Sequence, residues 1–287
     1  MARYNFFERM EREIDFQTEY EKIDYIILNE RIRGIGCLED VIEKFFRSLK
    51  YKENYVSFWE LREEFDFCYE YSDNYREKIP IGTVTNLEEF LLYCEMILNM
   101  FYGVIAPRVS QFGGTAEVIK KIVKEIIEII EYDLEKVNHE MCSKENGQVI
   151  IVQKNVAATA VADLVESDLA EIVIEYNHHL LQGDIKKKQI LLKKLADALE
   201  PKRAMLKGIN KTIESDFFYM VNSMNVRHNN CDVADKKKYN AKFATLTSQE
   251  QEDWYDEIYQ EGLMAFLMLE QANREKRIAA FKNTTTP

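Results

Sequence analysis

Residues 116–137 read AEVIKKIVKEIIEIIEYDLEKV and carry the clearest helical pattern in the chain. Apolar side chains recur every three or four residues along this stretch, which places them on one face of an α-helix. They are Ile119, Ile122, Val123, Ile126, Ile130, Leu134 and Val137. Lys121 and Glu125, like Lys124 and Glu128, are spaced four residues apart on the other face, where such pairs stabilise a helix. We therefore expect a long amphipathic helix from about residue 116 to residue 141.

Similar patterns on both sides of this stretch predict further helices. Capping residues mark the expected start of three of them: Ser57 before residues 58–71, Asn86 before residues 87–106, and Asp184 before residues 185–200. The remaining helices are expected over 4–32, 38–50, 167–181 and 202–226, with a last one after Thr247. Only 10 Gly and 4 Pro occur among 287 residues, too few for a fold of many short strands and turns. The sequence therefore predicts an all-α, multi-helix bundle with at most one short strand pair.

The segment 144–155, KENGQVIIVQKN, interrupts the helical period. Asn146-Gly147 is a turn signal, and the β-branched run from Val149 to Val152 indicates a short strand or an extended link. We place a domain boundary at this point. Residues 1–147 would form a helical N-terminal half with a sensing or interaction role, and residues 148–287 a helical C-terminal half.

Cysteine usage and hydropathy bear on the cellular compartment. The five cysteines are scattered and include no Cys-x-x-Cys pair, so neither disulfide partners nor a thiolate zinc site is expected. No apolar run approaches the roughly 18 residues that a membrane helix requires. The first residues, MARYNFFERMEREIDF, are charged throughout, unlike a signal peptide. We expect a cytoplasmic protein without a membrane partner.

Charge is unevenly distributed along the chain. Overall, 38 Lys and Arg against 50 Asp and Glu give a net charge of −12. Residues 184–242 hold 14 Lys and Arg against 7 Asp and Glu, a net charge of +7, which leaves −19 for the remainder. An acidic body with one basic segment can meet a polyanion locally without binding nucleic acid everywhere. Solvated lysine-bearing helix faces are the alternative explanation.

Residues 222–232, NSMNVRHNNCD, form the most distinctive polar motif. Arg227 supplies a permanent charge, His228 a proton that titrates near neutrality, and Asn229 and Asn230 neutral hydrogen-bonding groups, a combination that can surround a phosphate diester. The alternative is a helix C-terminus that carries a cation and capping asparagines. Basic residues on both sides of the motif favour contacts with an RNA backbone; we select Lys202, Arg203, Lys207, Lys211, Lys236, Lys237 and Lys238.

The long helix ending in NSMNVRHNN, the polar loop and the final helix EDWYDEIYQEGLMAFLMLE carry a family resemblance. From about residue 150 onward, the chain resembles prokaryotic abortive-infection-type proteins of phage defence and, more loosely, the HEPN superfamily of helical ribonucleases. The resemblance implies a helical bundle, homodimerisation and metal-independent RNA cleavage. The family motif has Arg, a polar residue and a later His. Arg227 and His228 match its first two positions, but Cys231, Asp232 and Val233 stand where the later histidine is expected.

Other kinds of catalytic site have little support. Glu175 and His178 form a Glu-x-x-His unit, and Glu171, Glu175 and His179 share a helix face, but a di-metal bundle needs a second such unit and none occurs. Phosphate-binding loops, dinucleotide-binding glycine motifs and nucleophile elbows are also absent from the sequence. We predict no metal and no cofactor.

Two functions remain open from the sequence. The first is an RNA-binding protein that cuts RNA without a metal: the ribose 2′-hydroxyl would attack the adjacent phosphate, His228 would move a proton and Arg227 would stabilise the developing charge. The second is a catalytically inert helical interaction or regulatory protein in which the RHNN motif is structural. The aromatic-rich, acidic first half suggests more apolar surface than one bundle covers, so we expect a homodimer.

Overall fold

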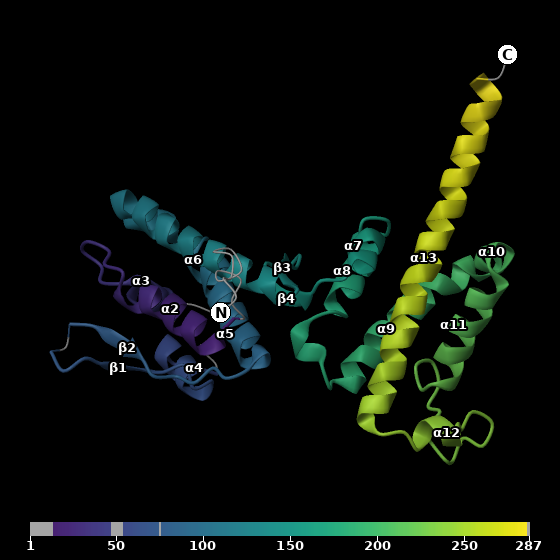
Figure 1. Ribbon diagram of the computed structural model, residues 1–287, viewed down its shortest axis with the longest axis horizontal. Helices are drawn as coiled ribbons and strands as arrows, with labels where there is room; N and C mark the ends of the chain where they lie inside the picture. Colours follow the sequence, from purple (N-terminus) through teal and green to yellow (C-terminus); the bar gives the residue numbers. More distant parts are fainter. Residues whose placement is uncertain (1–13, 47–53, 75, 286–287) are drawn as a thin grey trace, which may run out of the picture. The chain divides into compact units, whose positions relative to one another are not determined.

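The computed structural model describes residues 14–46, 54–74 and 76–285 (Figure 1). The chain is 66% helical, which confirms the predicted all-α character. The expected limit of one strand pair is wrong, since the described residues contain two small antiparallel pairs. The chain divides into two compact units, residues 1–151 and residues 152–287. The predicted boundary after residue 147 lies four residues before this division.

The N-terminal unit is built around three helices that bury apolar faces against one another. Helix α5 is apolar on most sides, as predicted, and Phe90, Cys94 and Ile97 on it are fully buried. The apolar stripe of α6 joins the same core. The elements are α2 (Phe16–Asn29), α3 (Leu38–Phe46), α4 (Phe58–Glu64), β1 (Tyr69–Tyr71), β2 (Lys78–Pro80), α5 (Leu87–Asn99), the π-helix η2 (Met100–Ile105), the 3-10 helix η3 (Val109–Thr115), α6 (Ala116–Lys136), β3 (His139–Ser143) and β4 (Val149–Gln153).

A salt bridge lies inside this core. Arg62 of α4 is fully buried and donates two hydrogen bonds to Asp24 of α2, at 2.8 and 2.7 Å. The Tyr93 hydroxyl of α5 donates to the same carboxylate at 3.0 Å. Burial raises the pKa of Tyr93 well above its ordinary value, so the phenol stays protonated and remains a donor. Three helices are thus tied together through one buried carboxylate.

Strand β1 replaces part of a predicted helix. Residues 58–71 were expected to be helical, but α4 ends at Glu64 and Asp66 adopts a left-handed φ of 58°. Beyond it, Tyr69 pairs with Pro80 and Tyr71 with Lys78 in an antiparallel ladder. Aromatic residues at every second position favour a strand once a partner strand is present.

The second strand pair confirms the turn predicted at residues 146 and 147. Gly147 takes a positive φ of 82°, and its N–H donates to the Lys144 carbonyl oxygen at 2.9 Å. Strand β4 covers the predicted β-branched run. The partner strand β3 was predicted as the end of the 116–141 helix, which is wrong: α6 ends at Lys136 and Asn138 turns the chain with a φ of 59°.

The buried carboxyl of Asp133 on α6 gives the N-terminal unit a pH-dependent stability. Burial and the neighbouring Glu19 carboxylate raise the pKa of Asp133 to about 6. A raised carboxyl pKa stabilises the fold fully below the unfolded pKa of about 3.9, and this contribution is lost as pH rises through 6. Replacing Asp133 with Asn should therefore increase the free energy of unfolding relative to wild type by an amount that grows from pH 4 to pH 7, to on the order of 2 kcal/mol.

Urea unfolding at several pH values tests this expectation. Glu125→Gln, which removes an exposed carboxylate from the same helix, serves as the control and should show no such growth. A difference between Asp133→Asn and wild type that is independent of pH would contradict the account.

The C-terminal unit is organised around α13, drawn in yellow in Figure 1, which packs against α9, α10, α11 and α7. Gly262 allows this close approach, because a Cβ there would lie 2.7 Å from Leu195 Cδ2. The elements are α7 (Val156–Ala162), α8 (Ser167–Glu175), the 3-10 helix η4 (His179–Leu181), α9 (Ile185–Leu199), the 3-10 helix η5 (Glu200–Lys202), α10 (Arg203–Ile209), α11 (Lys211–Ser223), α12 (Ala241–Ala244) and α13 (Ser248–Thr285).

Several predicted helix limits need correction. The helix predicted over 202–226 is broken at Asn210, whose side chain caps the start of α11 by accepting from the N–H groups of Thr212 and Ile213. Of the helices predicted over 4–32 and 38–50, residues 1–13 and 47–50 lie outside the described residues, and the described parts are α2 and α3.

The length and hydropathy of the described helices bear on whether they could cross a membrane. No single helix there is long and apolar enough to cross a membrane. The segments Leu87–Ile105 and Val109–Lys136 meet the length and composition criteria only as a pair, and they are bent by 83° at the break between them.

Candidate nucleic-acid interface

The predicted motif lies in the loop that connects α11 with α12, residues 224–240. Helix α11 ends at Ser223, and Asn225 turns the chain with a left-handed φ of 60°. At the far end of the loop, the Asn240 side chain accepts from the Phe243 N–H of α12 at 3.2 Å and donates to the Ser223 carbonyl at 2.9 Å. Asn240 therefore fastens the two ends of the loop to each other.

Asn230 holds the interior of the loop. Its side chain is only 3% exposed. The side-chain oxygen accepts from the Asn225 N–H at 2.9 Å, and the side-chain amide donates to the Lys238 carbonyl at 2.6 Å. Its backbone carbonyl accepts from the Asn240 N–H at 2.8 Å. Asn230 thus connects the beginning and the end of the loop and positions its lysines.

The guanidinium of Arg227 is directed to helix α9. It donates to Glu200 Oε2 and, at 2.8 Å, to the Ala196 carbonyl oxygen, and lies 3.6 Å from Asp197 Oδ1. The hydrogen bond from Arg227 lowers the pKa of Glu200 below its ordinary value. A cation on the carbonyls of the last helical turn is a favourable arrangement for a helix C-terminus. In this geometry Arg227 attaches the loop to α9 through its two terminal nitrogens, and its Nε is buried without a hydrogen-bond acceptor among the described residues.

His228 lies in a different environment from Arg227. Its imidazole is partly exposed, and Nδ1 lies 2.9 Å from the Lys238 ammonium nitrogen. An ammonium group has donors only, so a hydrogen bond in this contact uses Nδ1 as its acceptor. Asn229 is exposed beside it. Of the four predicted catalytic residues, Asn229 is exposed, His228 and Arg227 are partly buried, and Asn230 is buried.

A polar groove of about 550 Å³ opens beside this loop. We call it the loop groove; it is lined by Tyr219, Asn222, Ser223, Asn230, Lys237, Lys238, Tyr239, Asn240, Ala241 and Lys242. Lys237 and Lys238 are predicted RNA contacts, and Lys236 lies exposed next to them in the chain. Three of the lining residues are lysines, so an anion in the groove would meet several ammonium groups.

Seven residues that line the loop groove were not among the predicted site residues: Tyr219, Asn222, Ser223, Tyr239, Asn240, Ala241 and Lys242. Tyr219 is 62% exposed although it lies on a helix with a largely buried face. It stands four residues before the end of α11, so helical spacing places it on the same side as Ser223. The position of Lys242 within the basic segment was visible, but nothing in the sequence indicated that it faces the same groove as Lys238.

Lys207 and Lys211, two of the other predicted RNA contacts, lie at the opposite end of α11 from the loop. Lys207 and Lys211 are exposed on α10 and on the first turn of α11. The 13 residues of α11 span about 20 Å, which separates this group from the loop. Lys202 stacks over Phe266, with its ammonium nitrogen 4.9 Å from the ring centroid.

Arg203 is held within the protein. Its Nε donates to Glu214 at 2.6 Å, and its guanidinium lies 4.2 Å from the Phe218 ring centroid. Arg203 and Arg227 both contact Glu200, and both guanidinium groups lie over the Phe218 ring. The structure therefore brings Arg203 next to Arg227 and Lys236, Lys237 and Lys238 next to the loop groove, and places Lys207 and Lys211 at the other end of α11.

Cys231 is one of three residues at the positions where the motif considered in the sequence analysis would have a later histidine. Burial raises the pKa of its thiol above the ordinary value. A thiol with a raised pKa is mostly protonated at neutral pH and is a poor nucleophile. Cys231 thus offers no substitute for the missing histidine.

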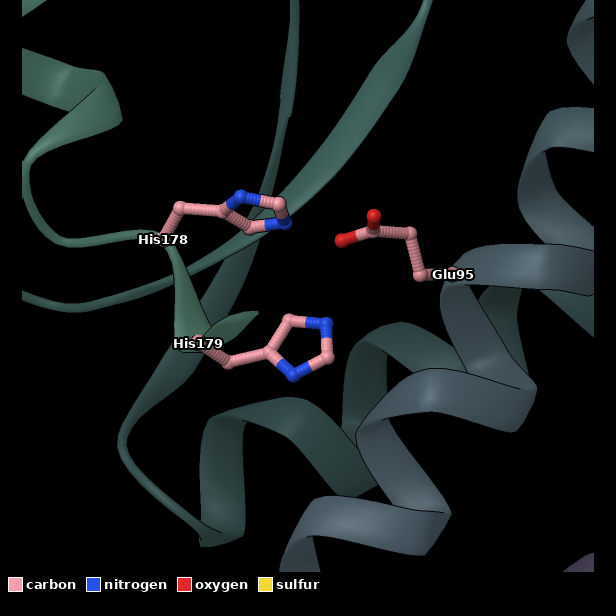
Figure 2. A group of neighbouring side chains, drawn as sticks. All are labelled: Glu95, His178 and His179. Carbon is pink, nitrogen blue, oxygen red and sulfur yellow. The ribbon is translucent and has the colours of Figure 1, made fainter. Parts of the chain in front are cut away.

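His178 and His179, considered above as metal ligands, are drawn in Figure 2. Their rings stand edge to face with centroids 5.1 Å apart, and the His178 backbone bridges to Val152. Glu175 instead pairs with Lys187 at 3.3 Å. Glu95, also labelled in Figure 2, belongs to the N-terminal unit, where it accepts from the Ile151 N–H at 2.8 Å. Among the described residues of either unit taken alone, no three metal-ligating side chains come together.

The arrangement around residues 219–242 is therefore a lysine-lined groove on a loop that Arg227, Asn230 and Asn240 hold in place. Its chemistry suits a polyanion, because the groove presents ammonium groups, amides and two tyrosine rings. Comparison of the chain with protein-family models, with curated proteins and with solved structures gave no match.

Proposed function

We propose that the C-terminal unit binds single-stranded RNA through the loop groove. The observation that supports this most directly is the convergence of Lys237, Lys238 and Lys242 on one polar groove. Ammonium groups neutralise backbone phosphates and release their counterions, which supplies most of the affinity of nonspecific RNA binding. The tyrosines of the groove add flat surfaces on which unpaired bases can stack.

The RHNN motif has a supporting role in this proposal. Arg227 attaches the loop to α9, and Asn230 links its two ends. Both residues therefore position the lysines without needing to touch RNA. The hydrogen bonds of Arg227 and Asn230 also explain why two of the four polar residues of the motif have their side chains directed into the protein.

Metal-independent RNA cleavage is the second candidate function, and the position of His228 favours it. The imidazole is accessible and lies beside Lys238, which lines the loop groove. A phosphate held by Lys238 would therefore lie near a group able to transfer a proton at neutral pH. The family resemblance implies the same activity, with the reservation that Arg227 is bound to Glu200 and the later histidine is missing.

Three further parts of the proposal, namely the biological role, the cellular location and the oligomeric state, rest on the sequence. A role in phage defence follows from the abortive-infection resemblance alone. A cytoplasmic location agrees with the five cysteines, all of which are free thiols. Homodimerisation is part of the same proposal. An inert interaction protein is the rival function, and it predicts no RNA binding at all.

A triple variant with Lys237, Lys238 and Lys242 each changed to Ala tests the main proposal. We expect it to bind a fluorescently labelled single-stranded RNA at least about tenfold more weakly than wild type at low salt, since each lost contact removes a charge-assisted interaction. The slope of log affinity against log salt should also become shallower by about 2, or roughly 0.7 for each phosphate contact removed. Fluorescence anisotropy at several salt concentrations measures both quantities.

The matched control removes the same charge from another surface of the same unit. Lys186, Lys193 and Lys194 are exposed on α9, and changing all three to Ala should weaken binding much less. Equal losses in both triple variants would show that net charge, and not the loop groove, determines binding. Wild type that fails to bind RNA at low salt would favour the inert rival.

A further inference from the structure

The N-terminal unit contains a second groove, and its character is apolar. We call it the α6 groove; it lies between η2 and α6, has a volume of about 400 Å³ and is lined by Phe101, Tyr102, Ile105, Ala106, Val109, Lys120, Val123, Lys124, Ile127, Glu128 and Glu131. Tyr102 is 37% exposed on its wall, and Val123 and Ile127 are partly exposed. The α-helical hydrogen-bond pattern of α5 gives way to a π-helix along this wall. Such irregular helical turns occur frequently at functional sites.

Charges on the rim of the α6 groove are arranged by sign. Lys120 and Lys124 lie toward the N-terminal end of α6, and Glu128 and Glu131 toward its C-terminal end. All four side chains are exposed, and with Ile127 they lie on one face of α6 at helical spacing. The apolar residues Val123 and Ile127 lie between the two pairs. One helix face therefore carries a basic end, an apolar centre and an acidic end.

The charge order along α6 is self-complementary: when a second copy of the helix lies antiparallel to the first, its basic end meets the acidic end of the first. If a second α6 ran antiparallel across the first about a two-fold axis at the level of residue 126, Lys124 would lie opposite Glu128 of the other copy. Lys120 would lie opposite residue 132, within one residue of Glu131 of the other copy. In a two-fold interface one surface meets its own copy, so each such pair occurs twice. Val123 and Ile127 of both copies would lie at the centre, where apolar contacts are most effective.

We propose that the α6 groove is the interface for a second copy of this chain, with the two α6 helices antiparallel. Helix α6 has 21 residues and a length of about 31 Å, which is enough for a helix-to-helix contact with apolar flanks from η2. Within the chain, Lys124 contacts Glu128 at 3.4 Å and Lys120 contacts Glu117 at 2.7 Å. Exposed pairs of this kind contribute little, so they exchange readily for pairs between copies. This inference is independent of RNA binding, which concerns the other unit.

Two charge-reversed variants test the interface. The acidic variant carries Lys120→Glu and Lys124→Glu, and the basic variant carries Glu128→Lys and Glu131→Lys. Wild type should sediment near twice the chain mass of 33.9 kDa at high micromolar concentration. Each variant alone places like charges opposite each other, and its dimerisation should weaken at least about tenfold. An equimolar mixture of the two variants should form a heterodimer, because an acidic face then meets a basic one.

Lys121→Glu and Glu125→Lys are the matched controls. Both residues are exposed on α6 but do not line the α6 groove, so these variants should dimerise like wild type. Circular dichroism checks that every variant remains folded. A monomeric wild type would overturn the proposal. So would charge-reversed variants that dimerise normally, or a mixture of folded variants that stays monomeric.

Discussion

Arg62→Ala should lower the free energy of unfolding of the N-terminal unit by about 3–5 kcal/mol, the usual cost of removing one partner from a buried ion pair. The Asp24 carboxylate would lose both of its guanidinium hydrogen bonds and keep only the Tyr93 hydroxyl. Asp24 is fully buried, so water cannot replace the lost charge without opening the core. Denaturant unfolding followed by circular dichroism measures the loss.

A double variant distinguishes the missing charge from the missing side-chain volume. Asp24→Leu combined with Arg62→Met leaves no unpaired charge in the core, and apolar replacement of a whole buried pair is often neutral or stabilising. We therefore expect the double variant to be more stable than Arg62→Ala. If the double variant is the less stable of the two, packing around Arg62 and not its charge accounts for the effect.

The second candidate function predicts an equally large effect at His228. If wild type cuts RNA in the presence of a chelator, His228→Ala should slow cleavage by about 100- to 10,000-fold, the usual contribution of a proton-transfer group. RNA affinity should change by no more than about twofold, because the lysines of the loop groove remain. Single-turnover cleavage of an end-labelled RNA gives the rate, and anisotropy gives the affinity.

Asn229→Ala is the matched control, since Asn229 is the exposed neighbour of His228 and has no ionisable group. It should reduce the cleavage rate far less than His228→Ala. Cleavage that His228→Ala leaves unchanged would remove His228 from the reaction and leave RNA binding as the function proposed for this loop. Cleavage lost equally in both variants would indicate a disturbed loop.

Local signals in the sequence were sufficient to predict where several of the longer helices begin, but α7 and α12 were not predicted, and α10 and α11 were predicted as one helix. Asn86 caps α5 by accepting from the Glu89 N–H at 3.0 Å, and Asp184 caps α9 by accepting from the Lys187 N–H at 3.0 Å. The predicted stripe of α6 is buried along most of its length. Caps and apolar stripes depend on residues within one or two turns, so they can be read without knowledge of the tertiary structure.

Strands β1 and β3 could not be predicted in the same way. Residues 65–71 and 137–141 continue an apolar spacing that also fits a helix. Asp66 and Asn138 end the helices by adopting a left-handed conformation, which short polar residues accept more readily than most. The strand partners then complete the change, and for β1 the partner is Lys78–Pro80.

Local sequence signals were even less informative about the candidate site than about the strands. The polar motif and the lysine run were visible as residues, but their contacts were not. Glu200 and Ala196, which bind Arg227, lie 27 and 31 residues earlier in the chain. Only the packing of α11 against α9 brings them together. The different environments of the motif residues, with Asn230 buried, Arg227 bound to α9 and Asn229 exposed, are therefore a tertiary property.

The salt dependence of RNA binding by the wild-type protein tests the central claim most directly. If the three lysines of the loop groove each contact a phosphate, log affinity should fall with log salt at a slope near −2, which corresponds to a loss of about 20-fold between 50 and 200 mM salt. Anisotropy titrations of labelled single-stranded RNA across this range provide the slope. Undetectable binding at 50 mM salt, or an affinity that does not change with salt, would contradict the account.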